Sequence, residues 1–377
     1  MVVTTRAAAR DLAPEAVVGL SRSFPLIARP GPVCLALEER VTQLSEVLDV
    51  PFGDAGATFA AHALTRAAGL ASECQRPKEV NRILRQHLAV YAGRDLLSGA
   101  AALAMLEPAT DLARLHALAG HTDRAVTWLT RLMHAVRTGT SISIDRYDLP
   151  LDHVDADPGE HELLQGWAWG RLLADAVKIL TMAGQRAEAA ALVTRHGGLG
   201  ARLTETRQAM VVAHLVAGEP VAARHYLAGA QPSLPWESEI ASCLAVLAAE
   251  PADRPADTAA LISTFQHSAP ATDLAAYRAR YGVMVTRLAH ATGHPYASIA
   301  RQVAAEAIAV GDGHAAREVV RTVAGCLSHK DIATLERNII RAGLRSGALT
   351  GYNLSRLRTT ADHATTILQE SLQAIPR

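Results

Sequence analysis

The sequence predicts an all-α fold, a right-handed solenoid of antiparallel helix hairpins interrupted by one long acidic loop. Two successive helical stretches, residues 165–195 and 203–228, each break once at a glycine, Gly184 and Gly218. These two glycines lie about 34 residues apart, a period typical of stacked helix–turn–helix units. The chain is also 49% hydrophobic but only 4% aromatic, which favours close contacts between helices rich in alanine and leucine.

Apolar residues at three- and four-residue spacing predict helices along most of the chain. Pro108 is expected to open a new helix, because proline is accepted in a first turn. The helices are expected at 34–50, 58–74, 78–91, 96–106, 108–118, 123–137, 165–182, 187–195, 203–216, 221–228, 236–249, 258–267, 272–291, 296–310, 315–327, 331–346 and 354–374. The domain order is therefore an N-terminal arm (1–32), N-terminal hairpins (33–137), an acidic insert loop (138–161), central repeats (162–310), and C-terminal repeats with a capping helix (311–377).

Composition excludes several classes of protein. Basic and acidic residues total 37 each, so no global field recruits nucleic acid. The N-terminus lacks the apolar core of a signal peptide, and no stretch approaches the roughly 18 apolar residues of a membrane helix.

The four cysteines form no Cys-x-x-Cys pair, which favours buried, reduced thiols. We expect a cytoplasmic protein with no membrane partner. Abundant alanine and arginine indicate a bacterial source.

The breaks between helices carry a recurrent pair of residues, a glycine and an alanine five positions later. The pairs are Gly120 and Ala125, Gly184 and Ala189, Gly218 and Ala223, and Gly311 and Ala316. They resemble the tetratricopeptide repeat, in which a glycine closes the first helix and a small residue packs near the start of the second. The resemblance covers about half of the chain. The large aromatic residues usual in the first helix are mostly missing.

The resemblance implies a concave groove lined by the first helix of each hairpin. Arg114, Lys178 and Val212 all stand six residues before a break glycine, while Arg171 and Gln208 share the same helices. His116 and His214 stand four residues before one. A peptide or protein partner is the ligand implied, and the cations suit an acidic peptide or a terminal carboxylate. Solvated arginines and half-buried packing histidines are the alternative interpretation.

The acidic insert holds the other candidates, namely Asp145, Tyr147, Asp148, Asp152 and His153. Carboxylates and imidazole could ligate a metal or transfer protons. Their spacing fits no known ligand loop, so we expect no metal and no cofactor, and the insert is interpreted as a disordered loop or an arm for a partner. Its stretch 142–149 could add a strand to a partner's sheet edge.

These observations favour a non-enzymatic repeat protein that binds a peptide or protein partner. No phosphate loop, dinucleotide fingerprint or His-Glu-x-x-His motif is present. Two alternatives stay open. One is a helical biosynthetic enzyme whose His/Asp pocket is covered by the insert, and the other is a regulatory protein that senses a signal peptide. A homodimer is compatible with each.

Overall fold

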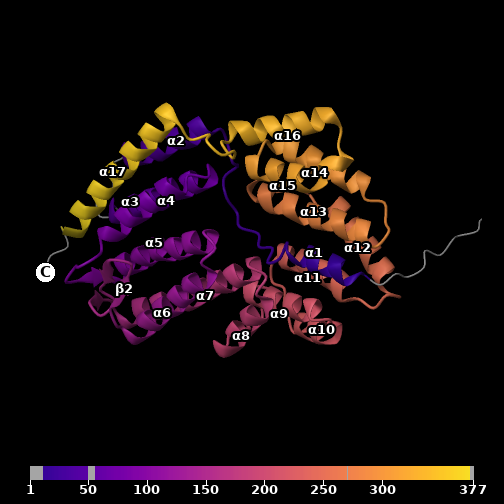
Figure 1. Ribbon diagram of the computed structural model, residues 1–377, viewed down its shortest axis with the longest axis horizontal. Helices are drawn as coiled ribbons and strands as arrows, with labels where there is room; N and C mark the ends of the chain where they lie inside the picture. The colour runs from indigo at the N-terminus through magenta and orange to yellow at the C-terminus, as the bar shows by residue number, and fades with distance from the viewer. Residues whose placement is uncertain (1–11, 50–55, 270, 374–377) are drawn as a thin grey trace, which may run out of the picture. The chain divides into compact units, whose positions relative to one another are not determined.

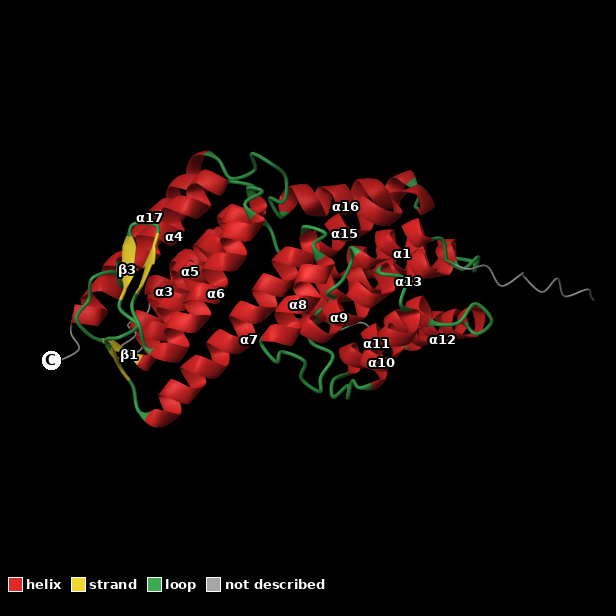
Figure 2. Ribbon diagram, turned by 60° about the horizontal axis from the view of Figure 1, so that its bottom comes forward, coloured by secondary structure: helices red, strands yellow, loops and turns green. Residues whose placement is uncertain are grey.

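The computed structural model describes residues 12–49, 56–269 and 271–373, and the all-α prediction is confirmed. Helices dominate the chain, and the strands are the few short yellow segments of Figure 2. Most helices lie where the apolar spacing predicts them, with ends shifted by a few residues. The N-terminal arm contains a helix, α1 (Pro14–Ser21), and residues 1–11 lie outside the described residues.

The chain forms two compact units, each assembled from segments that are distant in sequence. Unit 1 comprises residues 1–34 and 180–342, and unit 2 comprises residues 35–179 and 343–377. The helices of unit 1 are α1, α8 (Arg186–Arg195), α9 (Glu205–Val216), α10 (Pro220–Ala228), α11 (Pro235–Ala248), α12 (Arg254–His267), α13 (Ala275–Ala291), α14 (Ala297–Val310), α15 (Gly313–Val323) and α16 (His329–Arg341).

Unit 2 holds α2 (Leu37–Glu46), α3 (Gly56–Glu73), α4 (Pro77–Ala89), α5 (Gly99–Leu118), α6 (Thr122–Thr138), most of α7 (Pro158–Met182) and α17 (Gly351–Gln373). The C-terminal helix α17 packs against α3 and α2, so the last helix of the chain completes the core that the first helices of unit 2 begin.

The predicted breaks are helix-terminating turns. Each break glycine has a positive φ: Gly120 (88°), Gly184 (82°), Gly218 (76°) and Gly311 (73°). A residue with a Cβ rarely adopts this conformation, which ends the helix at that point. The alanines five residues later are all fully buried: Ala125, Ala189, Ala223 and Ala316. The small side chain leaves room for the next helix, and α5 packs against α6, α9 against α10 and α14 against α15.

The expectation of two helices on either side of Pro108 is wrong, because α5 continues through this residue. Proline removes one backbone N–H from the helical ladder. Met105, Leu106 and Ala109, which flank it, are each 0% exposed. Their burial in the core of unit 2 favours one continuous helix over two short ones.

The acidic insert is ordered, so the expectation of a long unstructured loop is wrong. β2 (Ile142–Ile144) pairs antiparallel with β3 (Tyr147–Leu149), and the turn between them places Asp145 at a φ of 51°. β4 (Val154–Asp155) pairs in parallel with β1 (Leu97–Ser98). The apolar residues of the hairpin alternate and are buried while the polar residues between them face outward, which is the period of a half-buried strand.

His87 should make unit 2 less stable in mild acid. The imidazole is 0% exposed on α4; its Nε2 lies 3.4 Å from the Tyr91 hydroxyl, and its Nδ1 has no partner among the described residues. Burial lowers the pKa of His87 to about 3. The unfolded chain, with a histidine pKa near 6.5, therefore binds more protons than the folded chain between pH 6.5 and 3.

This difference costs about 2 kcal/mol of stability between pH 7 and pH 5, at about 1.4 kcal/mol per pH unit below 6.5. The loss should vanish in His87→Leu, which cannot be protonated. Urea unfolding of both proteins at the two pH values measures it. If wild type and variant lose the same stability on acidification, His87 is not the group responsible.

Candidate functional site

A segment of the N-terminal arm, residues 19–31, lies along α9 and α13 of unit 1. The preceding helix α1 also packs against these two helices, as the indigo ribbon beside α13 in Figure 1 shows. The segment begins with the end of α1 at Ser21, passes through a turn at residues 22–23 and continues as residues 24–31, which include Pro25 and Pro30. Residues 24–31 are neither helix nor strand, and side chains of α9 and α13 hold them.

Gln208 of α9 forms hydrogen bonds with both the amide and the carbonyl group of one residue of the segment, Leu26. Its Oε1 accepts a hydrogen bond from the Leu26 amide at 2.8 Å, and its Nε2 donates to the Leu26 carbonyl at 2.9 Å. The Nε2 also donates to the Leu203 carbonyl at 3.1 Å, which fixes the orientation of the amide. Because Gln208 is 0% exposed, all three bonds form out of contact with solvent. The two hydrogen bonds to Leu26 involve only its main chain, so they do not depend on the side chain at position 26.

Two arginines of α13 bind carbonyl groups on either side of Leu26. Arg280 donates to the Ile27 carbonyl at 3.2 Å, and Arg287 donates to the Gly19 carbonyl at 2.8 Å and to the Ser23 hydroxyl at 2.6 Å. Burial lowers the pKa of both guanidinium groups from their usual value near 12.5. They remain cations at neutral pH, and charge-assisted hydrogen bonds of this kind are stronger than neutral ones.

The side chains of the segment alternate between buried and partly exposed positions. Phe24, Leu26 and Ala28 are 2%, 2% and 8% exposed, whereas Pro25 and Ile27 between them are only half-buried. A period of two is the mark of an extended strand with one face against an apolar surface. We call Glu205, Gln208, Arg280 and Arg287, together with the surface that buries Phe24, Leu26 and Ala28, the arm site.

The ends of the segment are anchored as well. Arg29 forms an ion pair with Glu205 of α9 at 2.9 Å, and the Gly31 amide donates to the Asp273 carbonyl at 2.9 Å. The arginine side chain is 57% exposed, so this pair adds little free energy but sets the register of the segment.

Of the residues predicted to bind a partner, Gln208 is the one that contacts an extended segment. Arg114 and Arg171 lie together in unit 2, where both bind the carboxylate of Asp175, and Arg114 also binds Asp111. The charges of the two arginines are therefore balanced by carboxylates of unit 2. Lys178 lies exposed on α7.

The two predicted histidines have different surroundings. The His116 ring lies 5.1 Å from the Trp128 ring, and burial, followed by the nearby charge of Arg124, lowers the pKa of His116. His214 stacks on the Tyr226 ring at 5.0 Å, and its Nδ1 lies 2.7 Å from a Glu219 carboxylate oxygen. It lines an open surface pocket of about 760 Å³ at the turn between α9 and α10.

The insert residues of unit 2 have separate partners. Asp145 binds Arg85 at 2.6 Å and Arg124 at 3.2 Å, across the tip of the hairpin. Asp148 accepts a hydrogen bond from Ser143 at 2.5 Å. Asp152 accepts one from Ser141 and lies 3.8 Å from His153. Tyr147 is buried beneath the Arg146 guanidinium. The hydrogen bond from Ser141 lowers the pKa of Asp152. These carboxylates stabilise the hairpin rather than converge on one point.

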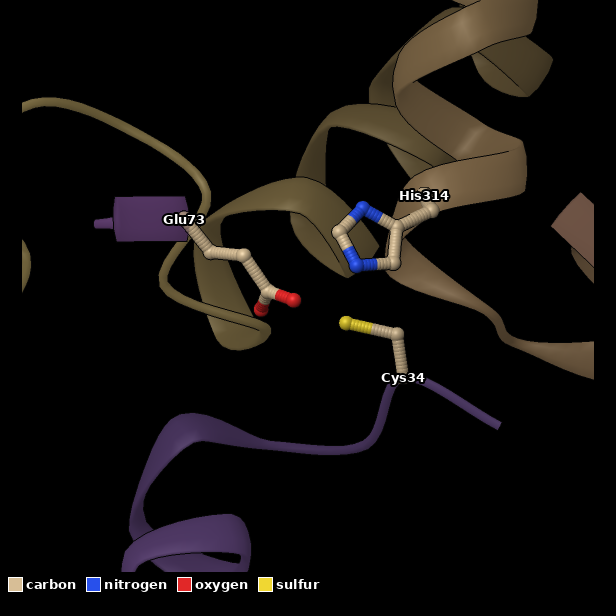
Figure 3. A group of neighbouring side chains, drawn as sticks. All are labelled: Cys34, Glu73 and His314. Carbon is tan, nitrogen blue, oxygen red and sulfur yellow. The ribbon is translucent and has the colours of Figure 1, made fainter. Parts of the chain in front are cut away.

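The end of the arm is fixed to the first turn of α15. Asp312, which is 3% exposed, accepts hydrogen bonds from the Cys34 and Ala315 amides, both at 2.7 Å. Beside this cap, the Cys34 sulfur and an imidazole nitrogen of His314 lie within 4.8 Å of each other (Figure 3). Glu73, also labelled there, belongs to unit 2. One thiol and one imidazole from unit 1 are fewer than the ligands of a structural zinc site.

Sequence reasoning missed the arm as a ligand, and with it Glu205, Arg280 and Arg287. The alternation of apolar residues from Phe24 to Ala28 is the signal that could have identified an extended, half-buried segment. Its pairing with α9 and α13 joins residues about 180 to 270 positions apart, which no local pattern encodes.

Among the described residues, no helix is long and apolar enough to cross a membrane. Comparison of the chain with protein-family models, with curated proteins and with solved structures found no match.

Proposed function

We propose that this chain is a non-enzymatic helical-repeat protein, resembling a tetratricopeptide solenoid, whose arm site binds an extended segment of a peptide or protein partner. The observation that carries the proposal is the pair of hydrogen bonds between Gln208 and the main chain of Leu26. A buried glutamine that satisfies both the amide and the carbonyl of one extended residue is suited to recognise a peptide backbone.

Two further features support peptide recognition. Arg280 also binds a carbonyl group of the segment, that of Ile27, and this contact does not depend on the side chain at that position. The Gly/Ala pairs resemble the breaks of a helical repeat, an architecture that commonly presents its first helices to a ligand. Contacts to the main chain give affinity, while the alternate apolar positions give specificity, as in other recognition of extended peptides.

The proposal is tested with the full chain, cut once so that the arm can leave. A protease site inserted between Pro32 and Val33 separates residues 1–32 from the rest after cleavage. A fluorescent peptide of residues 19–32 should then bind saturably to the cut protein, as measured by anisotropy, and the unlabelled peptide should compete with it.

The uncut protein is the matched control. Its tethered arm has an effective concentration on the order of millimolar, so the same peptide should bind at least about 10-fold more weakly. If the cut protein keeps its helical circular dichroism but binds no peptide, the arm site does not recognise separate segments. Unfolding on cleavage would equally contradict the proposal, because the arm would then be an inseparable part of the core.

A further inference from the structure

We infer that the partner of the arm site is an extended segment with three properties: apolar side chains at alternate positions, a backbone amide at the central one, and a basic residue three positions after it. The inference rests on the proposed function and specifies its ligand. In the arm these positions are filled by Phe24, Leu26, Ala28 and Arg29. The arm thereby acts as an internal competitor that such a segment must displace.

The central position requires an N–H group and an apolar side chain. The Leu26 amide is one of the two main-chain groups of Leu26 bound by Gln208, and the Leu26 side chain is 2% exposed. Proline at this position would leave the buried Oε1 of Gln208 without its donor, and a charged side chain would be buried without a partner. The preceding position has no such requirement, since the arm itself has proline at residue 25.

The two outer apolar positions differ in size. Phe24 and Ala28 are both buried, but one places an aromatic ring and the other a single methyl group against the helices. The ion pair between Arg29 and Glu205 follows directly after the small residue. The expected partner therefore has a large apolar, a leucine-like and a small residue at alternate positions, followed directly by a basic residue.

The arm is not the best possible occupant of its own site. Ser21 is 0% exposed, and its hydroxyl has no hydrogen-bond partner among the described residues. A buried hydroxyl without a partner has lost its hydration without compensation. Ser21 ends α1, so a peptide that forms this last turn with alanine in place of serine should bind more tightly than the arm's own sequence does.

A panel of peptides covering residues 19–32 tests the specificity on the cut protein by fluorescence anisotropy. N-methylation of the Leu26 amide should weaken binding about 10-fold, and Leu26→Asp should weaken it about 100-fold or more. Ser21→Ala should strengthen it several-fold. Methylation of the Ile27 amide, for which no hydrogen bond is found in the described structure, is the matched control and should leave the affinity within about 2-fold.

The basic position is tested by a charge exchange. The peptide with Arg29→Glu should bind about 3- to 10-fold more weakly to the wild-type site. Binding should recover on protein carrying Glu205→Arg, which in turn should weaken the reference peptide. A recovery of this kind assigns the effect to the register of the ion pair rather than to general charge.

The outcomes separate the inference from the proposed function. Saturable binding of the reference peptide, with equal affinities for the N-methyl and Leu26→Asp peptides, would overturn the stated specificity and leave peptide binding intact. Absence of binding by every peptide would overturn both. The ordered losses with recovery by charge exchange are the result that the structure predicts.

Discussion

Replacing Gln208 by leucine is expected to destabilise unit 1 by about 3 kcal/mol and to weaken peptide binding by the cut protein about 100-fold. The side chains are similar in size, so the cavity is preserved. The change leaves three backbone groups, the Leu26 amide and the carbonyls of Leu26 and Leu203, without their buried partner. Each such loss costs about 1 kcal/mol or more when water cannot enter.

Gln302→Leu provides the comparison for this change. Gln302 lies partly exposed on α14 and makes one hydrogen bond, at 3.0 Å, to Glu306. Its replacement should alter stability by no more than about 0.5 kcal/mol and leave peptide binding unchanged. Urea unfolding and anisotropy measure both quantities. If both substitutions change stability and peptide affinity equally, the hydrogen bonds of Gln208 contribute no more than that of a partly exposed glutamine.

Gly282→Ala should destabilise unit 1 by at least about 2 kcal/mol, although alanine favours a helix by about 1 kcal/mol over glycine. Gly282 lies in the middle of α13, where a Cβ would meet Val303 of α14 at 2.4 Å and the Phe265 ring of α12 at 2.8 and 2.9 Å. These distances are far shorter than any ordinary contact. The helices must therefore separate or the side chains must leave their rotamers.

Two further variants identify the cause. Gly170→Ala, on the exposed face of α7 with open space around the new methyl group, should be neutral or stabilising. Val303→Ala combined with Gly282→Ala should recover part of the loss, because it removes the nearest atom. Thermal unfolding of the single and double variants measures the coupling. If the two substitutions have strictly additive effects on the free energy of unfolding, contact with Val303 is not the cause of the destabilisation.

Local sequence patterns predicted the helices well. The apolar spacing and the Gly/Ala pairs depend on neighbouring residues, and Gly184 and Gly218 end their helices as expected. The continuous helix at Pro108 was not predictable, because burial of its neighbours in unit 2 decides it. The alternation over residues 142–149 predicted an extended stretch that could pair with a partner's sheet edge, but not that its two halves, β2 and β3, pair with each other.

The site was predicted in part. Gln208 was identified from its place in the repeat, but as a residue for a foreign ligand rather than for the arm. Arg114 was selected for its position six residues before Gly120, and Arg171 was expected to line the same face. The structure pairs both with Asp175, a contact that cannot be known before the helices are placed. The position of a residue in a repeat therefore does not show which side chain will pair with its charge.

The most direct test of the account is the resonance of one amide. A peptide of residues 19–32 with ¹⁵N at Leu26 is added to the cut protein, and the amide is observed by NMR. We predict a single bound resonance, shifted from its free position and protected from solvent exchange, that is lost with Gln208→Leu. A Leu26 amide that exchanges with water as fast in the presence of the protein as without it would contradict main-chain recognition by Gln208.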